Sequence, residues 1–365
     1  MRAFPAYFVL ITYCSFWSCK THNFKIIDST DEAIAYTGRT DTTHQGYENL
    51  YYSGTSVSLN FEGEKIEILL KDQYALNYFN VILDGKVISI LHPDTSWNYY
   101  LLASGLKPGK HKIELYKRTE WKHGKTIFGG FKITGKAIIL PKSPEKKKRI
   151  EFYGNSITSG YAVEDFSGAD SPDSIYTNHY LSYAAITARH FDAEHICICR
   201  SGIGITVSWM DETMVVMPEI YDRLNPADSN SYWDFKNYIP DIVVINLLQN
   251  DAWLTQMPES REFKYKFGTT APSEKQITQA YQSFVQKIRI KYPNTHIICA
   301  LGNMDACNVG APWFGYIQQA TSALADDKIF ALKFTFKNTP GHPTIKEQQA
   351  MADQLIRFID EHIDW

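Results

Sequence analysis

The chain has 365 residues, of which 44% are hydrophobic and 14% aromatic, enough apolar material for the cores of two ordinary domains. Its formal net charge is -3 and its isoelectric point lies near 6.4, so no excess of positive charge is available to neutralise a phosphate backbone. No run of lysine or arginine is interleaved with stacking aromatic residues. The composition predicts a globular protein and excludes nucleic acid as an expected partner.

The amino terminus has the pattern of an export signal. Arg2 precedes an apolar run and then small residues that lead to Cys19, which predicts a signal peptide over residues 1–19 that is too short to span a bilayer as an anchor. Residues 16–19 resemble a bacterial lipobox, in which Cys19 becomes the lipidated first residue of the mature protein. Ordinary cleavage beside a chance cysteine is the alternative, because Trp17 is bulky. Both interpretations predict an exported protein, periplasmic or attached to the bacterial outer membrane, with membrane contact only through a lipid anchor.

Residues 24–140 alternate short β-rich runs with turn signals. Asp84-Gly85 between two alternating apolar runs is a strong hairpin signal, and no helical periodicity competes with it. Many short strands at regular spacing predict an antiparallel β-sandwich of the jelly-roll kind. Residues 141–148 are polar, charged and contain proline, so we interpret them as the linker to a second domain.

Residues 149–365 change to a rhythm of strand and helix. The expected strands are short and nearly continuous apolar runs, as in parallel sheets that are covered on both faces. They span residues 149–153, 195–199, 241–247, 295–301 and 329–336. Helical patterns lie between them, at residues 181–191, at residues 275–292 and from Pro343 onward. The rhythm predicts a three-layer α/β domain with a doubly wound parallel sheet, whose ligands gather at the carboxyl ends of the strands.

Polar or glycine-containing segments follow four of the five expected strands. The first strand leads into Gly154-Asn155-Ser156, the second into a turn with Gly202, the third into a segment with Asn250, and the last is followed by His342. Each has a structural explanation on its own, as a helix cap, a glycine turn or a packed histidine. Together at one edge of a sheet they supply a serine nucleophile, two oxyanion donors and a histidine base, the set of groups that acyl transfer needs.

This ordered set resembles the SGNH, or GDSL-like, hydrolases. The resemblance implies that Ser156 is the nucleophile, that its amide together with Gly202 and Asn250 forms the oxyanion hole, and that His342 is the base. A jelly-roll domain ahead of such a hydrolase resembles the domain layout of carbohydrate esterase family two. Short sequence motifs of that family are similar to residues 115–120, 128–131, 245–251 and 341–343. That resemblance implies a flavodoxin-like sheet and a serine esterase that removes O-acetyl groups from carbohydrate without a metal or other cofactor.

Three positions depart from the family pattern. Asn155 replaces the usual aspartate of the first block, and Leu248 stands where a glycine is usual, where its side chain could crowd the turn or narrow the acyl pocket. Residues 339–341 before His342 contain no carboxylate. We therefore expect a Ser-His dyad, in which a backbone carbonyl of residues 337–340 accepts from His342 Nδ1.

Two other functions remain open from the sequence. One is a catalytically decayed carbohydrate-binding lipoprotein, and the other is an SGNH esterase for a different ester, such as a lipid or acetylated peptidoglycan. Trp209, Trp253 and Trp313 are candidates for stacking on sugar, although each can equally belong to the core. Cys197 and Cys199 alternate in an expected strand and fit a core better than a metal site, and no zinc-ligand spacing appears.

Overall fold

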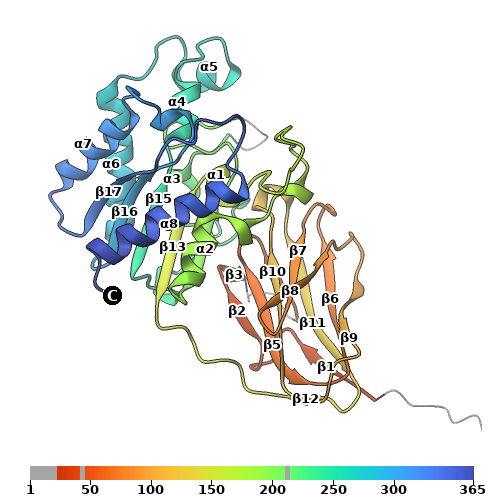
Figure 1. Ribbon diagram of the computed structural model, residues 1–365. Coiled ribbons are helices and arrows are strands. Elements are labelled where there is room, and N and C mark those ends of the chain that lie inside the picture. The colour runs from red at the N-terminus through yellow and green to blue at the C-terminus, as the bar shows by residue number, and fades with distance from the viewer. Residues whose placement is uncertain (1–22, 42–45, 210–213) are drawn as a thin grey trace, which may run out of the picture.

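A computed structural model describes residues 23–41, 46–209 and 214–365. The expected signal peptide over residues 1–19 and the lipidation candidate Cys19 lie outside the described residues. Within the described ranges, no helix combines the length and apolar character needed to cross a bilayer. The described chain folds into two domains that lie side by side and are joined by one long connector (Figure 1).

The amino-terminal domain consists of two antiparallel sheets, which confirms the predicted β-sandwich. Its strands are β1 (Phe24–Asp28), β2 (Ala35–Thr37), β3 (Thr40–Asp41), β4 (Glu48–Leu50), β5 (Ser56–Glu62), β6 (Lys65–Asp72), β7 (Phe79–Leu83), β8 (Lys86–Leu91), β9 (Asn98–Ser104), β10 (His111–Lys117), β11 (Thr126–Thr134) and β12 (Ile138–Ile139). One sheet has the order β3-β4-β11-β6-β9 with β1 beside β11, and the other has the order β12-β5-β10-β7-β8 with β2 beside β5. Alternate residues face the core between the sheets, such as Ile66, Ile68 and Leu70 of β6, because side chains of a strand point to opposite faces in turn.

The carboxyl-terminal domain contains a parallel sheet of five strands, which confirms the predicted α/β architecture. The strands are β13 (Arg149–Gly154), β14 (Glu194–Cys199), β15 (Ile242–Asn246), β16 (His296–Leu301) and β17 (Ile329–Lys333). Their order, β14-β13-β15-β16-β17, is the second, first, third, fourth and fifth in the chain, which is the flavodoxin-like order. The apolar runs of the sequence correspond to strands whose central members are buried on both faces.

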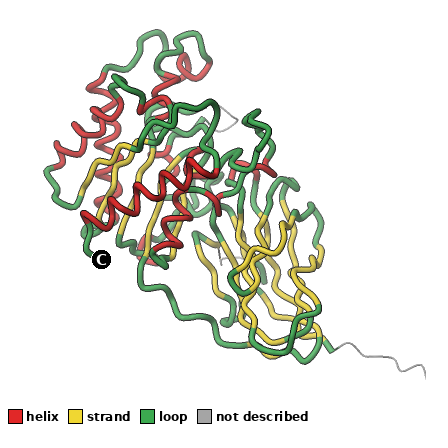
Figure 2. The backbone as a smooth tube through the Cα atoms, in the orientation of Figure 1, coloured by secondary structure: helices red, strands yellow, loops and turns green. Residues whose placement is uncertain are grey.

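Helices cover both faces of this sheet, as Figure 2 shows by the red coils on either side of the yellow strands. One face packs against α1 (Ser156–Ser159), α2 (Tyr183–His190) and α8 (Ile345–His362), and the other against α6 (Glu274–Lys291) and α7 (Trp313–Leu324). Short helices α3 (Met217–Ile220), α4 (Gln249–Leu254) and α5 (Arg261–Phe267) lie in the connections. The long helices begin at capping boxes, Ser273 with Gln276 for α6 and Thr344 with Glu347 for α8, because these side chains satisfy the free amides of the first turn.

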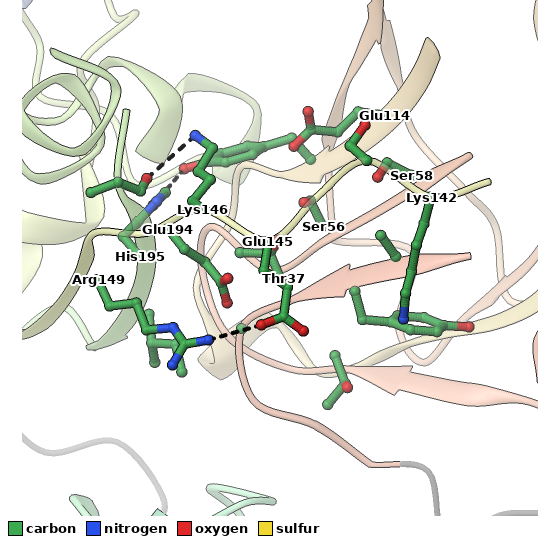
Figure 3. Close-up of a pocket in the computed structure, with 18 of the residues that line it drawn as sticks. Thr37, Ser56, Ser58, Glu114, Lys142, Glu145, Lys146, Arg149, Glu194 and His195 are labelled. Carbon is green, nitrogen blue, oxygen red and sulfur yellow. Dashed lines mark hydrogen bonds and ion pairs between the residues drawn. The ribbon is translucent and has the colours of Figure 1, made fainter. Parts of the chain in front are cut away.

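The two domains meet along a seam that buries charged side chains. Arg39 of the sandwich is fully buried and donates to Glu151 Oε1 of β13 at 2.7 Å. A cavity of about 630 Å³ lies between the two domains and is bordered by the connector. Figure 3 shows Arg149, Glu145, Glu194 and His195 among the residues that line it. Arg149 and Glu194 are the first residues of β13 and β14, so this cavity lies at the amino ends of the parallel strands.

Candidate active site

Ser156 lies immediately beyond the carboxyl end of β13, which is flanked by β14 and β15 in the parallel sheet. Asn155 precedes it in extended conformation, and its Oδ1 accepts from the amide of Ile157 at 3.0 Å, so Asn155 caps α1 and Ser156 is the first helical residue. A side chain at Gly154 could not be accommodated, since an added Cβ would lie 2.0 Å from Thr158 Oγ1. The asparagine that departs from the family pattern thus keeps the serine turn closed by the hydrogen bond that an aspartate would also make.

His342 reaches Ser156 from the loop before α8. Its Nε2 lies 2.8 Å from Ser156 Oγ. Ser156 is largely shielded from solvent, with 7% of its surface exposed. Nδ1 donates to the carboxylate of Asp170, at 2.8 Å to Oδ2 and 3.0 Å to Oδ1. The prediction that a backbone carbonyl of residues 337–340 fills this role is wrong. The group is a Ser-His-Asp triad rather than a dyad.

Asp170 is the functional residue that the sequence did not reveal. It precedes His342 by 172 positions and lies in the long loop between α1 and α2, where its Oδ1 also accepts from the backbone amide of His342 at 3.1 Å. Burial acts to raise the pKa of Asp170, but the hydrogen bonds and charge of His342 outweigh burial and lower it. The carboxylate is therefore ionised near neutral pH and fixes the tautomer in which Nε2 can accept the serine proton.

Gly202 and Asn250 border the same pocket as Ser156 and His342, which has a volume of about 300 Å³. Gly202 has φ of +83°, and an added Cβ would lie 3.0 Å from Trp209 Cβ, so both the backbone and the space favour glycine. Asn250 is buried and its Nδ2 donates to the carbonyl of Ile203 at 2.8 Å, which leaves the other amide hydrogen for a ligand. The structure thus gathers the four residues that the sequence selected.

Asp251, next to Asn250, holds the turn that follows Gly202. Its fully buried carboxylate accepts from the amides of Ile205 and Thr206 and from the hydroxyl of Thr206, at distances between 2.6 and 3.2 Å. Burial raises the pKa of Asp251, and these hydrogen bonds oppose that increase. The first turn of α4 therefore supplies both a pocket amide and the support of the neighbouring loop.

Leu248 does not narrow the pocket. Its φ of +77° is in the left-handed region that glycine normally occupies, which explains why a glycine is usual at this position. Its side chain is fully buried in the core on the α6 and α7 face and does not line the pocket. A non-glycine residue in this conformation costs about 1 to 3 kcal/mol, and here the burial of a leucine side chain offsets that cost.

The three candidate tryptophans have different positions. Trp209 and Trp253 border the pocket; Trp209 is 37% exposed, and Trp253 Nε1 donates to Asp305 Oδ2 at 3.1 Å. Trp313 is 5% exposed and packs edge-to-face on Tyr316 within the core. The expectation that Trp313 faces substrate is therefore wrong, because its side chain is part of the buried core and does not border the pocket.

Residues outside the predicted set complete the lining of the pocket. Tyr161 lies with its ring centroid 4.5 Å from that of His342, and Arg200, Ser201 and Lys122 also border the space. Lys122 belongs to the sandwich, not to the α/β domain. The pocket is consequently built from both domains.

One buried group among the described residues has the composition of a metal site. His179, Cys197 and Cys199 place possible ligand atoms within 4.8 Å of one another. His179 Nδ1 donates to the carbonyl of Thr158 at 2.9 Å, both cysteines are free thiols in the core, and none of the three lines the pocket that contains Ser156. The triad chemistry does not involve this group.

Comparison with solved structures places this arrangement in a known family. A family two carbohydrate esterase from Clostridium thermocellum, solved in complex with cellohexaose, is 31% identical, with 90% of this chain and 98% of that chain covered and a TM-score of 0.80. This chain belongs to carbohydrate esterase family two. Its named relatives are carbohydrate esterases, that is, carboxylic ester hydrolases, and the family model described as "Carbohydrate esterase 2 N-terminal" matches residues 36–142.

Curated relatives and a further solved structure extend the comparison. The cellulase/esterase CelE of Acetivibrio thermocellus is 31% identical over 354 residues, which cover 93% of this chain and 40% of CelE, so the chain spans less than half of that relative. An acetylxylan esterase / glucomannan deacetylase of Cellvibrio japonicus is 24% identical, with 93% of this chain and 91% of the relative covered. A family two carbohydrate esterase structure from Cellvibrio japonicus shares the fold, with 23% identity, a TM-score of 0.83, and 94% and 99% of the two chains covered.

Proposed function

We propose that this chain is a carbohydrate acetyl esterase that works through an acyl-enzyme. The observation that carries the proposal is the continuous line of hydrogen bonds from Asp170 through His342 to Ser156, which ends at a pocket between the two domains. A partly buried carboxylate, a correctly oriented imidazole and a hydroxyl at 2.8 Å have the geometry of a serine hydrolase triad.

Each residue of the pocket has a role in this reaction. Ser156 Oγ attacks the acetyl carbonyl while His342 Nε2 takes its proton, and the charge that develops on the carbonyl oxygen is stabilised by the amides of Ser156 and Gly202 and the side chain of Asn250. The tetrahedral intermediate collapses, His342 returns the proton to the sugar hydroxyl that leaves, and acetyl-Ser156 remains. Water, deprotonated by His342, then releases acetate and restores Ser156.

The shape and lining of the pocket favour a small acyl group on a carbohydrate. A volume of about 300 Å³ suits an acetyl ester with the sugar ring that carries it, and Trp209 at the rim offers an aromatic face to that ring. The relative named for acetylxylan and glucomannan, and the family two structure in complex with cellohexaose, support hemicellulose-type polysaccharide or oligosaccharide as the substrate class. Measuring acetate release from acetylated xylan, mannan and pectin tests this class directly.

The Ser156→Ala variant tests the nucleophile. We expect kcat for acetate release to fall by about 10⁶, since loss of the serine from a complete triad removes about that much of the rate in a subtilisin-type hydrolase. The fold should be unaffected because, within the described residues, Ser156 Oγ forms a hydrogen bond with His342 and with no other side chain. If Ser156→Ala and wild type both bind polysaccharide and neither releases acetate, the decayed binding protein is the better description. If wild type hydrolyses only long-chain esters, the substrate class is wrong.

We further propose that the mature protein is exported and anchored to a membrane through Cys19. The support is the apolar run and lipobox-like end of residues 1–19. In cells that are fed radiolabelled palmitate, wild type should acquire label and Cys19→Ala should not. Unlabelled wild type that is found free in the periplasm would favour simple signal cleavage.

A further inference from the structure

One loop of the sandwich reaches into the active site of the other domain. It consists of residues 118–123, follows β10 directly, and is named here the sandwich loop. Arg118 and Glu120 have no exposed surface, and Trp121 is 6% exposed. A loop that buries two charged side chains against another domain is part of a fixed structure rather than a flexible turn, because buried charges need fixed partners.

Arg118 holds the segment that carries the triad carboxylate. Its guanidinium forms an ion pair with Glu164 and donates to the carbonyls of Ile175 at 2.9 Å and Thr177 at 3.3 Å. These partners lie on both sides of Asp170 in the chain. The sandwich therefore fixes both ends of the loop from which Asp170 reaches His342.

Glu120 holds the turn that carries Gly202. Its carboxylate accepts from Ser201 Oγ at 2.6 Å and from the backbone amide of Ser201. Burial acts to raise the pKa of Glu120, but the charge of Lys122 and the hydrogen bonds from Ser201 outweigh burial and lower it, so the carboxylate is ionised. Hydrogen bonds to an ionised carboxylate are roughly twice as strong as those between neutral groups. We call the two hydrogen bonds from Ser201 to Glu120 the clamp, because together they restrain the turn.

Lys122 brings the sandwich loop to the pocket itself. Its side chain is 26% exposed, its Nζ lies 3.2 Å from Glu120 Oε1, and it lies over the ring of Tyr161 at 5.2 Å. Tyr161 in turn packs against the imidazole of His342. The ammonium group, which lines the pocket, can donate to a sugar oxygen while Glu120 holds it in place.

We propose that Glu120 is a positioning residue for the oxyanion hole and that Lys122 is a substrate contact, so that the sandwich loop is a working part of the esterase site. The inference rests on the proposed function, because it assigns Gly202 to the oxyanion. Gly202 lacks a side chain and needs an external restraint to keep its amide aimed at the developing charge. The clamp on the preceding residue supplies that restraint, and an error of about 1 Å in such a group can cost about 10²-fold in rate.

The test replaces Glu120 with glutamine in the full chain. Glutamine keeps the size of the side chain but is neutral, so the hydrogen bonds to Ser201 lose their charge assistance and the ion pair with Lys122 is lost. We expect kcat for an acetyl ester to fall by about 10- to 100-fold, less than the loss of a whole oxyanion donor, with KM for that small ester unchanged. Labelling of Ser156 by a phosphonate ester, whose adduct places an oxygen in the oxyanion hole, should slow in parallel.

Glu67→Gln is the matched control. Glu67 lies on β6 of the same domain and forms ion pairs with Lys65 and Lys132 at 3.0 Å, remote from the α/β domain. We expect its kcat, KM and melting temperature to match wild type. An unchanged kcat and labelling rate in Glu120→Gln would overturn the inference while the esterase assignment stands. Failure of the proposed function would give a different result: Ser156→Ala would hydrolyse the acetyl ester as fast as wild type.

A second variant covers the case in which Glu120→Gln does not fold. Ser201→Ala removes the hydroxyl donor to Glu120 and leaves the backbone amide donor, so it loosens the clamp without unpairing a buried charge. A lower kcat at unchanged KM and melting temperature supports the positioning role. A kcat equal to that of wild type overturns it.

Discussion

Buried charged side chains at the interface between the two domains fall into two groups with different structural roles. We call these groups the two parts of the seam. At the carboxyl ends of the parallel strands, Arg118 and Glu120 bind loop backbone that surrounds the catalytic residues. Elsewhere along the seam, Arg39 binds Glu151 in the middle of β13 and donates to the carbonyl of Tyr221 at 2.7 Å. The first part contacts the loops that carry catalytic residues, whereas the second contacts a strand of the sheet and a connection that does not border the catalytic pocket. Changes in the first should therefore affect turnover, and changes in the second should affect stability.

Among changes near the loop part of the seam, Asp170→Asn should give the largest loss of kcat with little change in the melting temperature. An asparagine amide would donate toward His342 Nδ1 and favour the wrong tautomer, so kcat should fall by about 10⁴, the loss that the same substitution causes in a chymotrypsin-type triad. Steady-state kinetics and thermal unfolding measure the two effects together.

Asp173→Asn is the control for that variant. Asp173 lies in the same loop, is exposed, and its side chain makes no capping hydrogen bond. It should behave as wild type. A loss below tenfold in Asp170→Asn would mean that a Ser-His dyad suffices for turnover here, against the triad role inferred from the 2.8 Å hydrogen bond.

Arg39→Met tests the sheet part of the seam. Removing Arg39 leaves Glu151 buried without its partner, which should lower the free energy of unfolding by about 3 to 5 kcal/mol. Because Arg39 does not border the catalytic pocket, kcat measured well below the melting temperature should stay the same. Urea denaturation followed by tryptophan fluorescence gives the stability.

Two further variants sharpen the result for Arg39. Arg149→Met breaks an ion pair with Glu145 that is largely exposed, so it should cost only about 0 to 1 kcal/mol. Adding Glu151→Gln to Arg39→Met removes the uncompensated charge and should recover part of the lost stability. If Arg39→Met lowered kcat and left stability intact, the division of the seam into two parts would be wrong.

His179 is buried, its backbone amide donates to the carbonyl of Arg118 at 3.0 Å, and its imidazole should make the stability of this region depend on pH. Burial lowers the pKa of His179 to about 4, so the folded protein keeps it neutral where the unfolded chain, with a pKa of about 6.5, takes up a proton. The unfolded state therefore binds more protons between these values, and stability should decrease as pH falls from about 6.5 to about 4. By pH 4.5 this residue alone should account for about 2 to 3 kcal/mol.

His179→Asn should remove that contribution. Its side-chain amide can still donate to the carbonyl of Thr158 but does not titrate. Urea denaturation at pH 7.5 and at pH 4.5 should show a smaller loss of stability in the variant than in wild type. Equal losses in the two proteins would place the pH sensitivity in other groups, such as the buried His195, whose pKa burial also lowers.

The sequence predicted the two-domain fold because its signals are local. A period of two residues with hairpin turns produces the sandwich, and apolar runs that alternate with helical patterns produce the parallel sheet. The four residues that gather in the pocket were identifiable for a related reason. Each lies in a segment that follows a strand, and parallel strands bring their carboxyl ends to one edge. That placement selected Ser156, Gly202, Asn250 and His342 without any knowledge of contacts.

Only the tertiary structure decided which distant residues meet at that edge. Asp170 lies in an irregular loop with no periodic signal, so its hydrogen bond to His342 depends on how that loop is held by Arg118 of the other domain. The role of the sandwich loop was hidden for the same reason, as was the burial of Trp313 in the core. Sequence patterns indicate local backbone conformation and which side chains of a strand or helix face the core. Contacts between two domains depend instead on tertiary packing, which no local pattern encodes.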